Sequence, residues 1–81
     1  MWYVYFLENK QKQFFYTGST NSLSRRLFQH QNGYVISTRR FLPLELVGYI
    51  ALPTEKQARE LEQYFKTGSG KTVLRKRILN T

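Results

Sequence analysis

Runs of apolar residues separated by polar gaps predict the order of elements along this chain. The stretch from Trp2 to Leu7 is apolar and aromatic without a polar interruption, which indicates a strand buried on both faces at the centre of a sheet. A polar interval over 8–13 leads to a second aromatic run over 14–18 that ends in glycine. The two runs therefore predict an antiparallel hairpin, and residues 44–52 show strand character again.

The first predicted helix covers roughly residues 22–31. Its apolar residues recur at helical spacing after polar capping candidates, and Asn32-Gly33 is a typical stop signal. From Gly33 to Pro43 the chain is irregular and basic, and Pro43 is incompatible with a helix there. We expect this segment to be a surface loop.

A second helix is predicted after Pro53. Thr54 is its expected cap, and Gln57 is placed for a capping box. The helix buries one apolar stripe, which consists of Ala58, Leu61 and Phe65.

The segment 67–70 breaks the helical pattern, and residues 68–72 are interpreted as a linker with a basic edge. Apolar residues among basic ones after it predict a short, basic, amphipathic terminal helix. The run from Gly68 to Thr72 reads GSGKT, like the end of a phosphate-binding P-loop. A strand should precede such a loop, but a helix is predicted there, so we expect no ATP binding.

Length and composition predict one globular domain over residues 1–81. Apolar residues make up 41% of the chain, enough to supply a core at this length. Cysteine is absent, which excludes disulfides and cysteine-based zinc sites. The apolar stretches are far shorter than the ~20 residues of a spanning helix, so we expect a cytoplasmic protein.

The charge balance favours a polyanionic partner. Thirteen Lys and Arg against five acids give a net charge of +8, and counterion release from phosphates favours binding of such a chain to nucleic acid. All five acids are Glu and there is one His, which excludes nucleases that hold metal with clustered Asp or with two His. A metal nuclease of this composition would have to rely on one Glu.

Glu62 lies beside the apolar stripe of the second predicted helix. At about 100° per residue it falls within roughly 40° of Ala58 and about 60° of Phe65. A carboxylate in that position costs free energy unless it gains a cation or hydrogen-bond donors, and metal binding is one such use. From spacing alone, an ion pair with a basic residue is favoured over a metal site.

Arg26 and His30 are four residues apart on the first predicted helix and share a face, whereas Arg25 points to solvent. A guanidinium can hold two phosphate oxygens and stabilise charge that develops on phosphorus. The alternatives are a solvated charge for Arg26 and a hydrogen-bonded packing residue for His30, which spacing alone favours. Tyr5 and Tyr16 lie on the two hairpin strands, where most tyrosines belong to the core.

These residues together resemble the GIY-YIG nuclease superfamily. Tyr3-Val4-Tyr5 and Tyr16-Thr17-Gly18 stand at its two naming triplets, with Tyr3 in place of a glycine and Thr17 in place of an isoleucine. The continuation from Tyr16 to Gly33 is similar to the family pattern throughout, including the helix that carries Arg and His. The later Ala, Glu and Lys-Thr-Gly positions also resemble small stand-alone members, so the resemblance covers nearly the whole chain.

The resemblance implies an α+β fold, a three-stranded antiparallel sheet flanked by helices in the order ββαβαα. It also implies a metal-dependent endonuclease that acts on nucleic acid, DNA more than RNA, in repair or processing. Glu62 would hold Mg²⁺ or Mn²⁺, and Arg26 would stabilise the transition state. Tyr5 would position or deprotonate the attacking water, and Tyr16 and His30 would orient water and phosphate. The identity of the general base stays open.

Two other functions are consistent with the same residues. One is a basic binding module that keeps the fold without turnover, and the other is an adaptor that needs a protein partner, since a chain of this length has no room for a separate DNA-targeting domain. In each case the expected contacts to the nucleic-acid backbone are basic residues of the loop and the terminal helix: Arg39, Arg40, Lys71, Arg75, Lys76 and Arg77.

Overall fold

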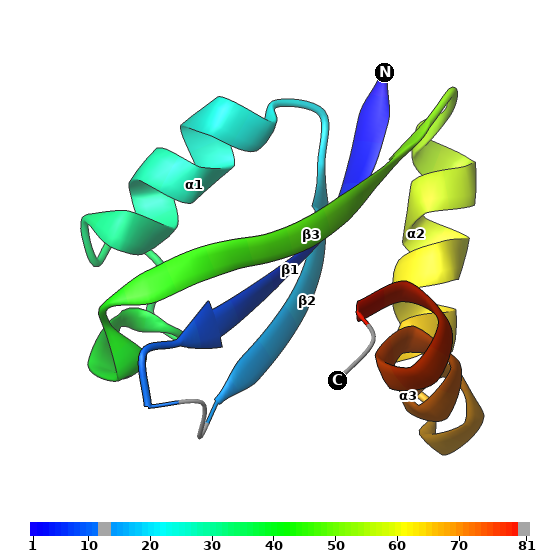
Figure 1. The fold of residues 1–81 in the computed structure, drawn as a ribbon. Coiled ribbons are helices and arrows are strands. Elements are labelled where there is room, and N and C mark those ends of the chain that lie inside the picture. Colours follow the sequence, from blue (N-terminus) through cyan, green and yellow to red (C-terminus); the bar gives the residue numbers. More distant parts are fainter. Residues whose placement is uncertain (12–13, 80–81) are drawn as a thin grey trace.

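Three antiparallel strands form the centre of the fold (Figure 1). The structure is a computed structural model that describes residues 1–11 and 14–79, with side chains described as far as residue 76 apart from those of 12 and 13. The order of elements along the chain is β1 (Trp2–Asn9), β2 (Phe15–Thr20), α1 (Leu23–Gln31), the short 3-10 turn η1 (Arg39–Phe41), β3 (Leu44–Leu52), α2 (Glu55–Phe65), α3 (Gly68–Val73) and the π-helical turn η2 (Leu74–Leu79).

The sheet order is β2-β1-β3, so β1 is the central strand. It pairs antiparallel with both neighbours, and Tyr5 stands opposite Gly18 on β2 and Tyr49 on β3. Helix α1 covers one face of the sheet, and α2 and α3 cover the other (Figure 1). The α+β class, the three-stranded antiparallel sheet and the central position of the first strand are therefore confirmed.

Alternate residues of β1 supply two separate cores. Val4 and Phe6 pack towards α2 with Ala58 and Phe65, whereas Tyr5 and Leu7 pack on the α1 side. Successive side chains of a strand point to opposite faces. An uninterrupted apolar run is what such a strand requires when both faces are covered.

The loop after α1 is only partly at the surface. Gly33 has a φ of 76°, which suits a glycine at the end of a helix. Thr38 is completely buried, and its hydroxyl bonds the ring of His30. The prediction of a surface loop is wrong at Thr38, because the buried imidazole needs a polar partner from this segment.

Thr54 caps α2 as predicted, but the Gln57 side chain bonds the Thr54 hydroxyl and not its backbone N–H as in a capping box. The hydroxyl of Thr54 accepts a hydrogen bond from the backbone N–H of Gln57 at 3.2 Å and donates one to its side-chain carbonyl at 3.2 Å. In this way the cap satisfies one backbone donor of the first turn, the N–H of Gln57, that would otherwise lack a partner.

The prediction of a linker over 68–72 is wrong, because these residues belong to α3. The hydroxyl of Thr67 caps this helix by accepting from the N–H of Gly70 at 3.0 Å. Gly70 lies against the carbonyl of Tyr64 at the end of α2, where a Cβ atom could not fit. Helix-to-helix contact therefore explains the P-loop-like glycine without a phosphate.

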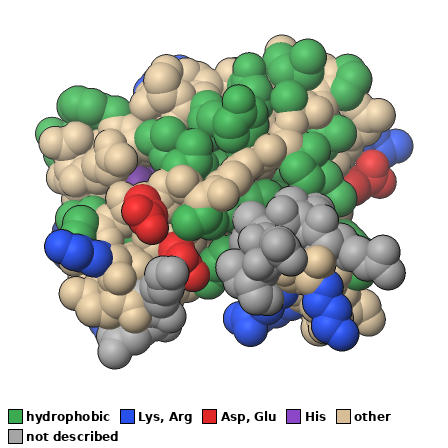
Figure 2. Space-filling view, in the orientation of Figure 1, with side chains coloured by type: hydrophobic (Ala, Val, Ile, Leu, Met, Phe, Trp, Pro, Cys, Tyr) green, Lys and Arg blue, Asp and Glu red, His purple; other side chains and the backbone are tan. Residues whose placement is uncertain are grey.

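The charges are distributed unevenly over the molecule. In Figure 2, hydrophobic side chains run along the face in front of the sheet, and acidic side chains lie together at its lower left. Glu8 and Glu45 are direct partners across β1 and β3, so like charges adjoin there. No helix of the described residues is long and apolar enough to cross a membrane.

Candidate active site

The ring of Tyr5 lies over the backbone of Gly18. A Cβ atom on Gly18 would stand 2.5 Å from the Tyr5 oxygen and 2.9 Å from a ring carbon of Tyr16. Cross-strand partners share a face of the sheet, so the Tyr5 ring crosses its partner position only because no side chain is there. Gly18 is required for close approach and not for an unusual backbone angle.

The Tyr5 hydroxyl joins Arg26 and His30 of α1. Arg26 Nε donates to the Tyr5 oxygen at 3.3 Å, and the same oxygen lies 2.9 Å from His30 Nε2. On the other side of the ring, His30 Nδ1 lies 2.9 Å from the Thr38 hydroxyl, which itself reaches the carbonyl of Val35. These five groups form one continuous chain of hydrogen bonds.

Burial sets the protonation of this chain. It raises the pKa of Tyr5 to about 12, although the bond from Arg26 opposes the shift. It also lowers the pKa of His30 to about 4, with the charge of Arg26 acting in the same direction. At neutral pH the phenol is therefore protonated and the imidazole is neutral. With Thr38 donating to Val35, the consistent assignment has Nδ1–H donating to Thr38 and Nε2 accepting from Tyr5.

Tyr16 completes the aromatic wall around His30. Its ring centroid lies 5.1 Å from that of the imidazole and 6.2 Å from that of Tyr5. The pairing of Tyr16 with Leu7 on β1 puts it on the α1 face of the sheet. The two tyrosines, Arg26 and His30 are thus brought together by β1, β2 and α1.

Glu62 lies on the opposite face, on α2. Its side chain is 12% exposed and forms an ion pair with Lys66 at 2.7 Å, and one carboxylate oxygen accepts a hydrogen bond from Ser19. Burial opposes ionisation, but the bonds from Lys66 and Ser19 and the charge of Arg59 outweigh it and lower the pKa of Glu62. The carboxylate is consequently an anion at neutral pH.

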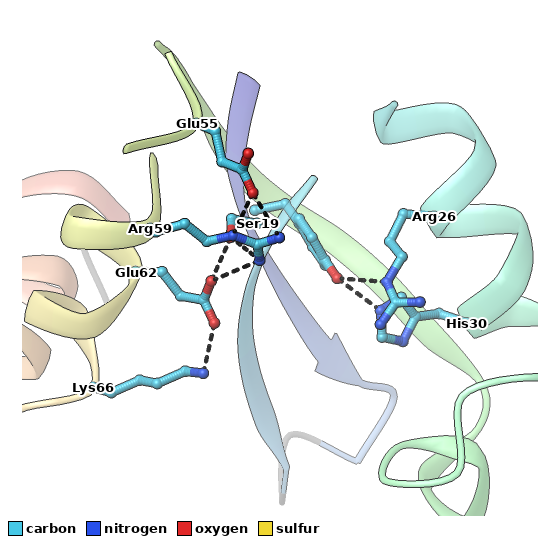
Figure 3. Close-up of polar contacts among 8 residues, drawn as sticks. Ser19, Arg26, His30, Glu55, Arg59, Glu62 and Lys66 are labelled. Atoms are coloured by element: carbon cyan, nitrogen blue, oxygen red, sulfur yellow. Dashed lines mark hydrogen bonds and ion pairs between the residues drawn. The ribbon is translucent and has the colours of Figure 1, made fainter. Parts of the chain in front are cut away.

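Ser19 on the edge strand β2 lies between the two sides and bonds Glu62 and Arg59 of α2. Figure 3 shows Glu62 and Lys66 on one side of Ser19, and Arg26 and His30 on the other. No hydrogen bond or ion pair joins Glu62 to the Tyr5 chain within the described residues. Between the two sides lies a groove of about 520 Å³, whose lining is mostly polar: Trp2, Ser19, Thr20, Asn21, Arg25, Arg26, Gln29 and Arg59.

Comparison with known proteins shows the family to which this chain belongs. A family model for the GIY-YIG catalytic domain matches residues 1–77, which includes every strand and helix that bears on the groove. The chain belongs to the GIY-YIG family.

Two relatives support this membership. The chain is 39% identical over 62 residues to a UPF0213 protein of Cupriavidus pinatubonensis, and the match covers 75% of this chain and 68% of that protein. It is also similar to a UPF0213 protein of Bacillus halodurans whose solution NMR structure is known, with 35% identity, a TM-score of 0.54, and coverage of 91% and 82% of the two chains. Neither name states an activity.

A GIY-YIG domain of this composition offers a metal ion a single carboxylate. Within the described part of the chain there is no cluster of three or more potential His, Cys, Asp or Glu ligands. Glu62 and the Ser19 hydroxyl are hard oxygen donors, and Mg²⁺ commonly binds through one or two carboxylates with waters and substrate phosphates. The residues therefore fit a magnesium-type ion, provided that it displaces the half-exposed ammonium of Lys66.

The residues predicted to contact the nucleic-acid backbone lie elsewhere. Arg39, Arg40, Lys71, Arg75 and Lys76 are exposed, but none of them lines the groove, and the side chain of Arg77 is outside the described residues. Sequence reasoning missed Ser19, Thr38 and Arg59. Arg25 is exposed as predicted but also lines the groove. A weak signal existed for Arg59, which stands three residues before Glu62 on the same helix face.

Proposed function

We propose that this GIY-YIG domain, residues 1–81, is a metal-dependent endonuclease that hydrolyses phosphodiester bonds in nucleic acid, with DNA as the expected substrate. The observation that carries the proposal is the groove, which Arg26 and Ser19 line. Tyr5 and His30 hold Arg26 from one side, and the ionised Glu62 bonds Ser19 on the other, although none of these three is among the lining residues. A phosphate placed there would meet a fixed cation and a site for a metal ion.

Arg26 is the residue that would touch the phosphate. Its Nη1 bonds Gln29 at 3.0 Å and its Nε bonds Tyr5, so the guanidinium is held in place before substrate binds. Burial alone would lower its pKa, but the interactions with Tyr5 and Tyr16 together outweigh burial and raise the pKa, so the charge is permanent at neutral pH. A preorganised cation of this kind stabilises charge that develops in the transition state.

Tyr5 acts in this scheme as a phenol. Its oxygen accepts a hydrogen bond from Arg26, and its O–H donates one to His30 Nε2. Its remaining lone pair would accept a hydrogen bond from a water, but no proton is left to donate to a phosphate oxygen. A phenolate would require the proton to pass to His30, whose pKa of about 4 makes that transfer unfavourable. His30 is fully buried and is therefore a positioning residue that acts through Tyr5, with Tyr16 packed against both rings.

Glu62, together with Ser19, would hold the metal ion, Mg²⁺ or Mn²⁺. When bound, such an ion polarises a phosphoryl oxygen and lowers the pKa of a water. Repair or processing of nucleic acid, a cytoplasmic location and a protein partner for targeting complete the proposal.

A specific observation favours one alternative, a binding module that cuts weakly or only with a partner. Both oxygens of Glu62 already interact with Lys66, Ser19 and Arg59. A carboxylate neutralised in this way attracts a metal ion less strongly, so the domain would bind nucleic acid through its arginines without turnover.

The deciding experiment is cleavage of fluorescent duplex, single-stranded, flap and branched DNA and the matching RNA, with Mg²⁺ or Mn²⁺ and with EDTA. We expect metal-dependent cutting that falls by at least about 100-fold in Glu62→Gln and in Arg26→Ala, because each removes transition-state stabilisation. Lys10→Gln is the matched control, since Lys10 is exposed and does not line the groove. Salt-sensitive binding without cleavage in any condition would replace the nuclease by the binding module.

A further inference from the structure

Three arginines converge on the groove, and only one of them belongs to the site proposed above. Arg25 and Arg26 come from α1 and Arg59 comes from α2, while no acidic residue is among those that line the groove. Like charges that converge in this way repel one another, unless an anion lies between them. The groove therefore has more positive charge than the one phosphate at Arg26 requires.

We propose that Arg59, with Arg25 on the α1 side of the groove, forms a second phosphate subsite, which binds the nucleic-acid backbone next to the phosphate held by Arg26. The substrate would then be a polynucleotide with a phosphate beside the cleaved bond, and not a mononucleotide ester. This inference deepens the proposed function and rests on it for the position of the cleaved bond.

Arg59 is held by three different groups. Its Nη1 donates to the Ser19 hydroxyl at 2.9 Å, its Nε and Nη2 point to Glu55 at 3.4 and 3.3 Å, and its guanidinium lies 5.1 Å from the centre of the Trp2 ring. A guanidinium has five N–H groups, so donors remain for a phosphate. Because the side chain is already positioned, binding would cost it little conformational entropy.

An ion pair with Glu55 alone does not explain this placement. Both side chains are more than half exposed, and an exposed pair four residues apart on a helix contributes little to stability. Such a pair does not need Trp2 or Ser19. These two contacts turn the guanidinium across the strand edge towards the groove, as Figure 3 shows for Arg59 and Ser19.

The subsite adjoins the proposed metal ligand and is distinct from Arg26. Arg59 Nη1 lies 3.9 Å from the Glu62 carboxylate, and both side chains contact Ser19. Arg25 is held separately, through a 3.0 Å bond to Asn21. A backbone that follows the groove from Arg26 to Arg59 would therefore place successive phosphates at different arginines.

The test is binding without metal, so that its result does not depend on cleavage. Fluorescence anisotropy of a labelled duplex in EDTA, over a series of salt concentrations, compares the wild type with Arg59→Gln, Arg25→Gln and Lys10→Gln. We expect each arginine variant to weaken binding by roughly 5-fold and to reduce the slope of log K against log salt by about 0.9, the value for one lost phosphate contact. Lys10→Gln removes the same charge outside the groove and should keep the slope.

Arg59→Lys and neutral linkages make the test specific. Arg59→Lys keeps the charge and should restore most of the slope. A methylphosphonate replaces one charged phosphate of the duplex by a neutral group. At one position this replacement should weaken binding of the wild type but not of Arg59→Gln, because the neutral phosphate and the missing arginine remove the same contact. A wild-type slope in Arg59→Gln, or full additivity at every position, would overturn the subsite even if the protein cuts DNA. If the slopes are as expected but the separate assay with Mg²⁺ or Mn²⁺ shows no cleavage, the subsite is supported and the nuclease is refuted.

Discussion

At the residue scale, two protons decide the chemistry of the candidate site. Tyr5 keeps its proton because burial raises its pKa to about 12, and His30 remains neutral because burial lowers its pKa to about 4. The Tyr5 hydroxyl can therefore donate to His30 while accepting from Arg26. A charged imidazole ring has N–H groups at both nitrogens and could not accept the hydrogen bond from the Tyr5 hydroxyl. The network therefore depends on a neutral ring.

The low pKa of His30 predicts a pH-dependent stability. The unfolded chain binds a proton below pH 6.5, the ordinary value for His, whereas the folded protein binds it only near pH 4. The contribution is therefore complete above pH 6.5 and is lost as the pH falls towards 4. Urea unfolding should show that the wild type loses about 2 kcal/mol more than His30→Gln between pH 7 and 4.5. Equal losses in the two proteins would mean that His30 titrates normally.

At the scale of elements, the pattern of apolar residues was sufficient where burial decides the structure. The uninterrupted run of β1 and the spaced apolar residues of α2 predicted buried elements, and both are present. The start of α3 could not be predicted from its composition, because Gly-Ser-Gly is typical of a linker. Contact with the end of α2 and the cap by Thr67 outweigh the low helix propensity of glycine.

The two glycines of α3 give a matched pair of substitutions. A Cβ on Gly70 would collide with the carbonyl of Tyr64, whereas a Cβ on Gly68 would have no atom within 4 Å. We expect Gly70→Ala to destabilise the protein by roughly 1–3 kcal/mol, as overpacking does. Gly68→Ala should be neutral or stabilising by up to about 1 kcal/mol. Urea unfolding followed by circular dichroism measures both, and equal effects would contradict the close packing of α3 on α2.

At the scale of the whole molecule, the site lies where two helices from opposite faces meet the edge of the sheet at β2. The resemblance of the sequence to a family indicated Tyr5, Arg26, His30 and Glu62, and their roles stay predictions. Neither periodicity nor charge could indicate Ser19, because its importance comes from strand order: as the partner of Val4 it faces α2. Those basic residues chosen from sequence whose side chains the structure describes are exposed, but local charge does not show which surface forms the groove.

This arrangement predicts where nucleic acid docks. The arginine-lined groove is at the β2 edge of the sheet. On the β3 side, Glu45 of β3 pairs with Glu8 of β1, and these two acidic residues repel phosphates. In a titration of the ¹⁵N-labelled protein with a short duplex in EDTA, amide NMR shifts should therefore change most over residues 19–29 and around 59, and least over 45–50. Glu45→Gln should leave the affinity and its salt dependence as they are in the wild type. Shifts centred on β3, or clearly tighter binding by Glu45→Gln, would place the nucleic acid at the opposite edge of the sheet and exclude the groove as its binding site.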